Sequence, residues 1–170
     1  MLRRILIPFL CLLGLFCTLQ AQDAPALKIA TLHPILGDMA RAIGGSHVQV
    51  ADLLRPNGNL HSFEPAPQDI AAAGQARLVL ASGKNLEPYL PKLKDALGGR
   101  AQILDLGASI PDVPVAADTA DHDHGHDGDC CAHGPNDPHW WHTPANMKRA
   151  ARALAAALTR MDPAHEQDYN

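Results

Sequence analysis

The sequence has few aromatic residues and no surplus of positive charge. Aromatic side chains make up 4% of the 170 residues, whereas hydrophobic residues as a whole make up 46%. A folded core must therefore be built from Ala, Leu, Ile and Val. Lys and Arg total 14 against 18 Asp and Glu, which gives a formal net charge of -4. Because binding to phosphate backbones needs a basic surface, the sequence argues against nucleic acid as a partner.

The N-terminus has the pattern of an export signal. Two arginines precede an apolar run over residues 5–15, and small Ala21 follows. We predict a cleavable signal peptide over residues 1–21 and a periplasmic mature chain. The apolar run is shorter than the ~20 residues of a membrane-spanning helix. Anchoring as a lipoprotein at Cys17 is disfavoured because bulky residues, rather than a small one, precede this cysteine.

Few cysteines remain once the signal peptide is removed. The mature chain keeps only the adjacent pair Cys130 and Cys131, which cannot connect distant parts of a fold. In an oxidising compartment they could form a vicinal disulfide, pair between chains, or act as thiolate metal ligands when reduced. Both cysteines are kept as candidate metal ligands, beside the alternative that they have no role.

Short apolar segments alternate with helical patterns along the first half of the mature chain. Apolar or Val-rich runs predict four strands, at residues 27–32, 47–54, 77–81 and 102–106. A helix is predicted after the first strand, over residues 35–43. This alternation predicts an α/β fold, a parallel four-stranded sheet flanked by helices, with ligands bound beyond the carboxyl ends of the strands.

The second half changes character twice. Residues 108–136 are rich in Pro, Asp, Gly and His with almost no large apolar side chain, which predicts a disordered loop. A long amphipathic helix is then predicted over residues 143–161, with Thr143 as the N-cap and a proline at the first helical position. A further helix is expected to begin after Asp162.

Histidine is the residue that points most directly to function. The chain has 10 histidines, and several alternate with Asp and Gly inside the predicted loop. Imidazoles and carboxylates are ligands that zinc accepts. The candidate loop ligands are His122, His124, His126 and His133. The alternative is a chance histidine tract, and a flexible segment of this kind would bind metal loosely, so a firmer site is expected elsewhere.

Three motifs and the His-rich loop occur in a recognisable order. His61-Ser62-Phe63-Glu64-Pro65 comes first, then a Gly83–Tyr89 segment, then the acidic His-rich loop, and finally Asp137-Pro138-His139 with Trp141. In this order they resemble the periplasmic zinc- and manganese-binding proteins of metal ABC transporters. The resemblance covers the whole mature chain.

The resemblance implies a fold, a site and a partner. Two α/β lobes would be joined by one long helix, with metal held in the cleft between them and passed to a membrane permease. His61 and His139 would be the metal ligands of the N-terminal lobe, and the His-rich loop an auxiliary collector that goes with zinc rather than manganese. The expected cargo is therefore Zn²⁺, with Mn²⁺ as the second choice.

The sequence also departs from this family. Its members are roughly twice as long, so we expect an N-terminal lobe over residues 22–162, the start of the inter-lobe helix over 163–170, and no C-terminal lobe. Such a site would have two of the four protein ligands of a tetrahedral zinc site. A lone lobe is also expected to expose apolar surface, including part of the helix over 143–161.

The remaining histidines divide into one further candidate and three structural residues. His142 stands where the family more often has an apolar residue and is kept as a candidate extra ligand. We expect His33 to be a turn residue, although it could face the cleft. His47 is expected at the surface, and His165 is expected to be a solvated helix residue.

The sequence favours a binding protein over an enzyme. The leading hypothesis is zinc capture in the periplasm and delivery to a metal ABC permease. One alternative is a periplasmic zinc buffer that acts through the His-rich loop alone. Another is a zinc hydrolase in which Glu64 activates a metal-bound water, but no HExxH-type spacing supports it.

Overall fold

One parallel sheet organises the fold. The structure is a computed structural model that describes residues 25–114 and 136–170. The strands are β1 (Leu27–Thr31), β2 (Val48–Asp52), β3 (Leu78–Ala81) and β4 (Gln102–Asp105), in the order β2-β1-β3-β4. All pairings are parallel. The predicted α/β fold with a parallel four-stranded sheet is confirmed.

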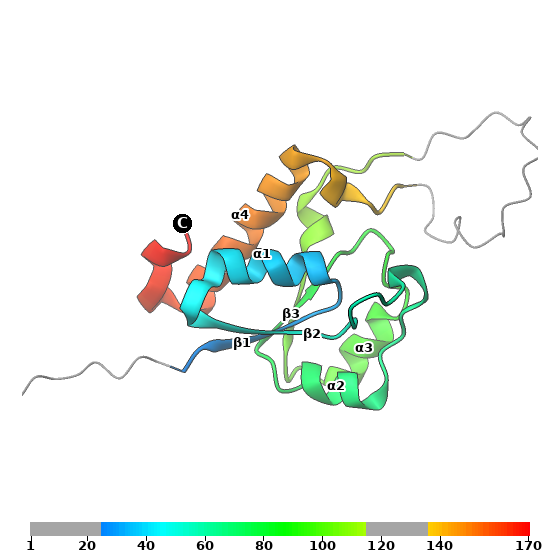
Figure 1. The fold of residues 1–170 in the computed structure, drawn as a ribbon, viewed down its shortest axis with the longest axis horizontal. Coiled ribbons are helices and arrows are strands. Elements are labelled where there is room, and N and C mark those ends of the chain that lie inside the picture. The colour runs from blue at the N-terminus through cyan, green and yellow to red at the C-terminus, as the bar shows by residue number, and fades with distance from the viewer. Residues whose placement is uncertain (1–24, 115–135) are drawn as a thin grey trace, which may run out of the picture.

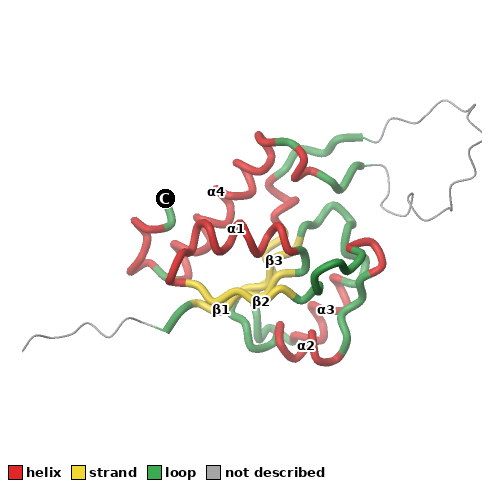
Figure 2. The backbone as a smooth tube through the Cα atoms, viewed as in Figure 1, coloured by secondary structure: helices red, strands yellow, loops and turns green. Residues whose placement is uncertain are grey.

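Helices cover both faces of this sheet. The α-helices are α1 (Pro34–Gly44), α2 (Pro67–Ala73), α3 (Leu90–Leu97) and α4 (Pro144–Met161). Short 3₁₀ helices are η1 (Gly45–His47), η2 (Leu60–Ser62), η3 (Leu106–Ser109), η4 (Trp140–His142) and η5 (Pro163–Asp168). Figure 1 shows α1 and α4 on one side of the sheet and α2 and α3 on the other. Figure 2 shows the same three layers as helix, strand and helix.

The burial of each strand follows its place in the sheet. All four residues of the interior strand β3 are buried, whereas β2 at one edge alternates half-buried and exposed residues. A parallel strand covered on both faces reads as a continuous apolar run, which is why the sequence pattern identified β3. β2 was identified by its alternation instead.

Two apolar clusters lie on opposite faces of the sheet. Leu78 and Leu80 belong to the cluster packed against α1 and α4. Val79 and Ala81, from the same strand, belong to the cluster packed against α2 and α3. Successive strand residues point to opposite faces, so one strand supports both layers.

The start of α4 differs in detail from the prediction. Pro144 is at the first helical position, but the side chain of Thr143 makes no capping hydrogen bond. Its backbone carbonyl accepts the N–H groups of Asn146 and Met147 instead. The proline already fixes the backbone angle that the first turn needs, so the helix begins here without a side-chain cap.

Part of the predicted disordered loop is ordered. Residues 108–114 and 136 belong to the described structure, whereas residues 115–135 lie outside it. The Asp105 carboxylate accepts the N–H of Ala108 in η3, and Pro114 pairs with Asn136 in an isolated antiparallel bridge. Residues 108–114 and 136 are therefore held by these polar contacts and by the buried side chain of Ile110, and disorder over the remaining residues stays a prediction.

The C-terminal segment folds back on the lobe. Residues Pro163–Asp168 form η5, a 3₁₀ helix with a kink at His165, where a further helix was predicted to begin. The rings of His47 and His165 stack with centroids 3.8 Å apart, and the hydroxyl of Tyr169 donates to Asp162. The half-buried His47 and His165 are therefore not surface and solvated residues as predicted. The assignment of residues 163–170 to an inter-lobe helix remains a prediction.

A membrane-spanning helix does not occur in the part of the chain that the structure describes, because none of its helices is both long and apolar enough.

Candidate metal centre

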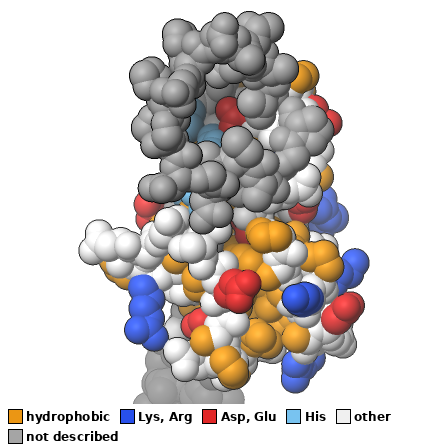
Figure 3. Space-filling view, turned by 90° about the vertical axis from the view of Figure 1, so that its right-hand side faces the viewer, with side chains coloured by type: hydrophobic (Ala, Val, Ile, Leu, Met, Phe, Trp, Pro, Cys, Tyr) orange, Lys and Arg blue, Asp and Glu red, His pale blue; other side chains and the backbone are white. Residues whose placement is uncertain are grey.

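The loops at the carboxyl ends of the strands bring the first predicted ligand into place. β2 ends at Asp52, and the following loop leads into η2, which contains His61. The side chain of Asn59 accepts the backbone N–H of His61 at 2.9 Å. This contact fixes the short turn on which the imidazole stands. Figure 3 looks onto this end of the molecule, where histidine side chains are visible.

The second predicted ligand is held by an aspartate two residues before it. Asp137 Oδ1 accepts the backbone N–H of His139 at 2.9 Å and lies 2.7 Å from its Nδ1. An ionised carboxylate only accepts hydrogen bonds, so Nδ1 carries the proton and Nε2 of the neutral ring has the lone pair. The backbone and imidazole N–H groups of His139 also lower the pKa of Asp137. The aspartate therefore selects the tautomer that can bind a metal through Nε2.

The two imidazoles meet although they are 78 residues apart in the chain. His61 Nε2 lies 3.3 Å from His139 Nε2, and the ring centroids are 5.2 Å apart. Two nitrogens bound to one zinc ion at about 2.0–2.1 Å and a tetrahedral angle lie about 3.3 Å apart. The pair therefore has the spacing of two vertices of a tetrahedral zinc site.

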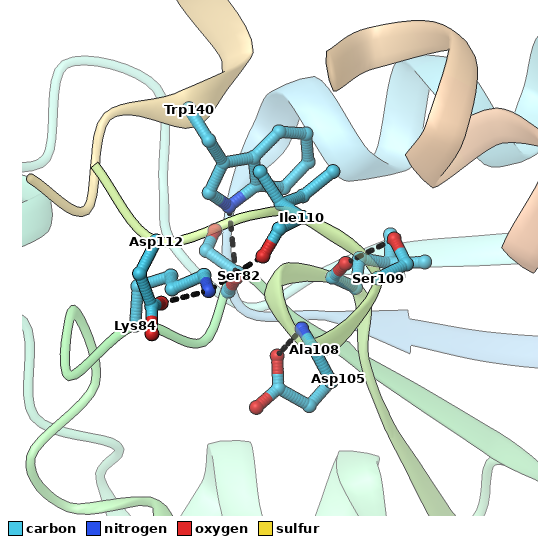
Figure 4. A network of polar contacts seen from close by, with 9 residues as sticks. Ser82, Lys84, Asp105, Ala108, Ser109, Ile110, Asp112 and Trp140 are labelled. Atoms are coloured by element: carbon cyan, nitrogen blue, oxygen red, sulfur yellow. Dashed lines mark hydrogen bonds and ion pairs between the residues drawn. The ribbon is translucent and has the colours of Figure 1, made fainter.

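A buried tryptophan fixes the backbone next to His139. Trp140 is 4% exposed, and its Nε1 donates to the backbone oxygen of Ser82 at 2.9 Å, as Figure 4 shows. Ser82 follows β3 directly, and its N–H and that of Gly83 donate to the buried carboxylate of Glu87. Burial raises the pKa of Glu87. Trp140 thus ties the segment that carries His139 to the carboxyl end of β3.

His33 lies beside this site, which the sequence indicated only as a minor alternative. It follows β1, its Nδ1 is 3.2 Å from the Ser82 hydroxyl, and its ring is 4.6 Å from that of Trp141. Trp141 in turn contacts His139, with centroids 5.3 Å apart. Burial, and then the nearby charge of His139, lower the pKa of His33 to about 4. The sequence signal that could have indicated this place for His33 is its position two residues after a buried parallel strand.

Of the other predicted ligands, only His142 lies among the described residues, and it does not join the pair there. The ring centroid of the exposed His142 is 6.3 Å from that of His139. Within residues 25–114 and 136–170, no three or more His, Cys, Asp or Glu side chains are placed to hold one metal ion. The remaining candidates, His122, His124, His126, His133, Cys130 and Cys131, lie outside the described residues.

Glu64 does not support hydrolytic chemistry. It lines a groove together with Ile70 of α2 and Leu93 of α3. No described group of three metal-binding side chains combines it with His61 and His139. The described residues therefore do not place Glu64 in one metal-binding group with His61 and His139, which the zinc hydrolase hypothesis would have to assume.

Comparison with protein families gives a match over most of the chain. The family described as zinc-uptake complex component A, periplasmic, or ZnuA, matches residues 29–170. The chain belongs to the ZnuA family. The resemblance found in the sequence is therefore confirmed, and the relatives are substrate-binding proteins of metal transporters rather than enzymes.

Relatives of this ZnuA-family chain are named for different metals. The iron-binding protein YfeA of Yersinia pestis is 31% identical over 154 residues, which is 88% of this chain and 44% of YfeA. The manganese-binding lipoprotein MntA of Halalkalibacterium halodurans is 25% identical over 149 residues, again 88% of this chain and 44% of the relative. The chain thus spans less than half the length of these relatives.

Solved structures show the same arrangement. A zinc-bound crystal structure of a ZnuA deletion mutant superposes with a TM-score of 0.70 at 28% sequence identity. The superposition covers 85% of this chain and 50% of that one. The ZnuA-family fold of this chain therefore corresponds to about half of the solved molecule, as expected of one lobe.

Proposed function

We propose that this protein captures Zn²⁺ in the periplasm and delivers it to the membrane permease of a metal ABC transporter. The observation that carries the proposal is the 3.3 Å separation of His61 Nε2 and His139 Nε2, which fits two ligands of one tetrahedral zinc ion. The hydrogen bond from His139 Nδ1 to Asp137 supports it, because that contact places the proton on Nδ1 and the lone pair on Nε2, the nitrogen that faces His61.

The choice of zinc as cargo rests on ligand chemistry. Zinc accepts neutral imidazoles in four-coordinate sites, and these are the ligands that the described pair supplies. Among the relatives, YfeA is named for iron and MntA for manganese, so Mn²⁺ and Fe²⁺ are the competitors to be measured. The ligands beyond His61 and His139 would decide between them.

The mature chain is expected to follow its signal peptide into the periplasm. Residues 1–24 lie outside the described structure, so cleavage after Ala21 is part of the proposal. The lipoprotein reading at Cys17 is the alternative, and MntA carries that description. Mass spectrometry of the exported protein separates the two, since lipidation adds acyl chains at the cysteine.

Calorimetric titration of residues 22–170 with Zn²⁺ tests the metal site. We expect the variant with both His61→Ala and His139→Ala to lose the tighter binding step, whereas His47→Ala keeps it. His47 is a suitable control because it precedes β2, while His61 follows that strand. Equal binding by the double variant and the parent would exclude the His61–His139 pair as the site.

A deletion separates capture by this pair from capture by the His-rich segment. Removing residues 121–133 should leave the tighter step in place, because the described pair does not include that segment. If the deletion abolishes all binding, the protein is a buffer that acts through the His-rich segment. Affinity should also fall as the pH is lowered, since metal must displace protons from the imidazoles.

Delivery to a permease is tested by transfer. Zinc-loaded protein is mixed with a metal ABC permease reconstituted in vesicles, and zinc inside the vesicles is measured with and without ATP. ATP-dependent uptake that requires the chain supports delivery. If the chain retains its zinc both with and without ATP, the protein captures zinc but does not deliver it to the permease.

A further inference from the structure

Lys84 is an unusual residue in the loop between β3 and α3. Its side chain is only 13% exposed, and its ammonium group donates to the backbone oxygen of Ile110 at 2.7 Å and pairs with the carboxylate of Asp112. Figure 4 shows both contacts beside Trp140. A single lysine thus joins the loop after β3 to the segment that follows η3.

The backbone at Lys84 is held in a conformation that L-residues rarely adopt. Its φ is 56°, between Gly83 at 71° and Asn85 at 62°. A non-glycine residue in this region costs on the order of 1 kcal/mol, so a compensating contact is expected. The ammonium contacts with residues 110 and 112 are such a compensation.

The segment that Lys84 holds continues to the metal ligand. Residues 110–113 are called the stem here. Val113 O accepts the backbone N–H of Asp137 at 2.8 Å, and the next residue, Pro114, bridges to Asn136. Asp137 is the residue whose carboxylate holds Nδ1 of His139. A continuous series of contacts therefore runs from Lys84 through the stem and Asp137 to His139.

A second contact path reaches the same histidine through the core. Ile110 is 4% exposed and belongs to the apolar cluster that contains Trp140. Trp140 follows His139 directly and is hydrogen-bonded to Ser82, which lies two residues before Lys84. The ammonium group thus stabilises the position of Ile110, which belongs to the same apolar cluster as Trp140.

We propose that Lys84 is a positioning residue for the metal site, acting through the stem and Asp137 on the orientation and tautomer of His139. The proposal rests on the proposed function only in taking His139 as a metal ligand. The contrasting interpretation is a surface ion pair without influence. That interpretation fits poorly, because Lys84 is mostly shielded from water and its ammonium also donates to a backbone carbonyl.

Three variants of residues 22–170 test the proposal. Lys84→Met keeps the length of the side chain and removes its charge, Lys84→Arg restores a cation, and Lys94→Met removes a charge from the exposed surface of α3. In zinc titrations, Lys84→Met should weaken binding by about 3- to 10-fold, less than the loss of a direct ligand partner. Lys84→Arg should recover most of that loss, and Lys94→Met should match the parent.

A measurement without metal separates this proposal from the proposed function. The ring nitrogens of His139 are observed by ¹⁵N NMR in metal-free protein at a pH where the ring is neutral. We expect the parent to hold the proton on Nδ1 and Lys84→Met to show an increased share of the Nε2–H form. If the parent binds no zinc but Lys84→Met still shows a larger share of the Nε2–H form than the parent, zinc capture is refuted. The role of Lys84 in positioning the ring of His139 then stands.

A further variant separates positioning from general loss of stability. Lys84→Gly relieves the left-handed backbone but also removes the ammonium, so it should unfold no more readily than Lys84→Met while weakening zinc binding similarly. Lys84→Met with unchanged zinc affinity and an unchanged His139 spectrum would overturn the proposal. So would full binding by Lys84→Gly.

Discussion

Asp137 sets the chemistry of His139 at the scale of a single residue. The carboxylate accepts both the backbone N–H and the imidazole N–H of the same histidine. The first contact fixes the backbone of His139, and the second fixes the rotation and the tautomer of its ring. A free imidazole divides its proton between two nitrogens, so this arrangement directs the lone pair of Nε2 towards His61 before any metal arrives.

Removing that carboxylate should weaken metal binding while the fold stays intact. We expect Asp137→Ala to lower zinc affinity by about 10- to 100-fold, the usual effect of losing the partner of a ligating histidine. Asp137→Asn should lie between this variant and the parent, because the amide oxygen still accepts a hydrogen bond but carries no charge. Calorimetric titration measures both.

The control for this prediction is Asp95→Ala on the exposed surface of α3. It removes the same charge from the chain without touching His139. If Asp95→Ala weakens binding as much as Asp137→Ala does, the effect is one of net charge and not of the hydrogen bond.

His33 should make stability depend on pH. Its folded pKa is about 4, lowered from 6.5 first by burial and then by the charge of His139. Between these pH values the unfolded chain binds a proton at His33 that the folded chain does not. The free energy of unfolding therefore falls as the pH is lowered through this window, and the contribution of His33 is complete above it. The loss should be on the order of 2 kcal/mol for the metal-free protein.

Urea unfolding at about pH 7.5 and about pH 4.5 measures this loss. His33→Asn removes the titrating ring, so the difference between the two pH values should shrink by that amount, whatever the variant does to stability at neutral pH. A difference as large as that of the parent would show that other groups cause the dependence.

At the scale of the element, α4 connects the core to the site. It begins two residues after His142, and its buried residues pack in the same cluster as α1 and Trp140. Leu154 lies on this face and is fully buried. The helix therefore holds the base of the segment that carries His139.

Truncating Leu154 should destabilise the whole lobe. We expect Leu154→Ala to lower the free energy of unfolding by about 2–5 kcal/mol, since it removes buried methyl groups and leaves a cavity. Arg152→Ala, on the exposed side of the same helix, should stay within about 0.5 kcal/mol of the parent. Denaturant unfolding monitored by circular dichroism compares the two. Equal effects would place Leu154 outside the cooperative core.

The elements that could be predicted from sequence are those specified locally. The β3 strand is a continuous apolar run, and α4 has apolar residues at spacings of three and four after a proline. The pair His61 and His139 was predicted through motif order, and the structure brings the two rings together. Local pattern was therefore sufficient for the fold class and motif order for the proximity of this pair, whose role as metal ligands stays a prediction.

The features missed by sequence reasoning depend on contacts between distant residues. Lys84 and Ile110 are 26 residues apart, and nothing in either neighbourhood indicates that one holds the other. The stacking of His47 on His165 joins the start of β2 to the C-terminal segment. Such pairings follow from how layers pack, and a single sequence does not encode them as a local pattern.

At the scale of the whole molecule, the described lobe encloses its core on both sides. A lone lobe was expected to expose apolar surface, including part of α4. Among the described residues, Val113 is the only large hydrophobic side chain that is exposed. Leu154 and Leu158 of α4 are fully buried against α1 and neighbouring segments. The apolar residues that α4 leaves partly exposed are smaller or half-buried, such as Met147 and Ala151, so the expected exposure of part of this helix stays a prediction.

Because both apolar clusters share the strands of one sheet, the metal-free lobe should unfold as a unit. β3 contributes alternate residues to each cluster, so loss of one layer exposes the other. Calorimetry of residues 22–170 without metal should show a single transition. Two resolved transitions would mean that the layers on the two faces of the sheet are independent.

Zinc should then stabilise this unit only through the site. At about 100 times the dissociation constant, binding to the folded state adds about 2.7 kcal/mol, which raises the Tm of a domain of this size by about 5–10 °C. The variant with His61→Ala and His139→Ala should unfold near the parent's metal-free Tm, because both residues lie outside the two apolar clusters. It should gain little on addition of zinc. An equal gain by parent and variant would place the stabilising ion elsewhere in the molecule.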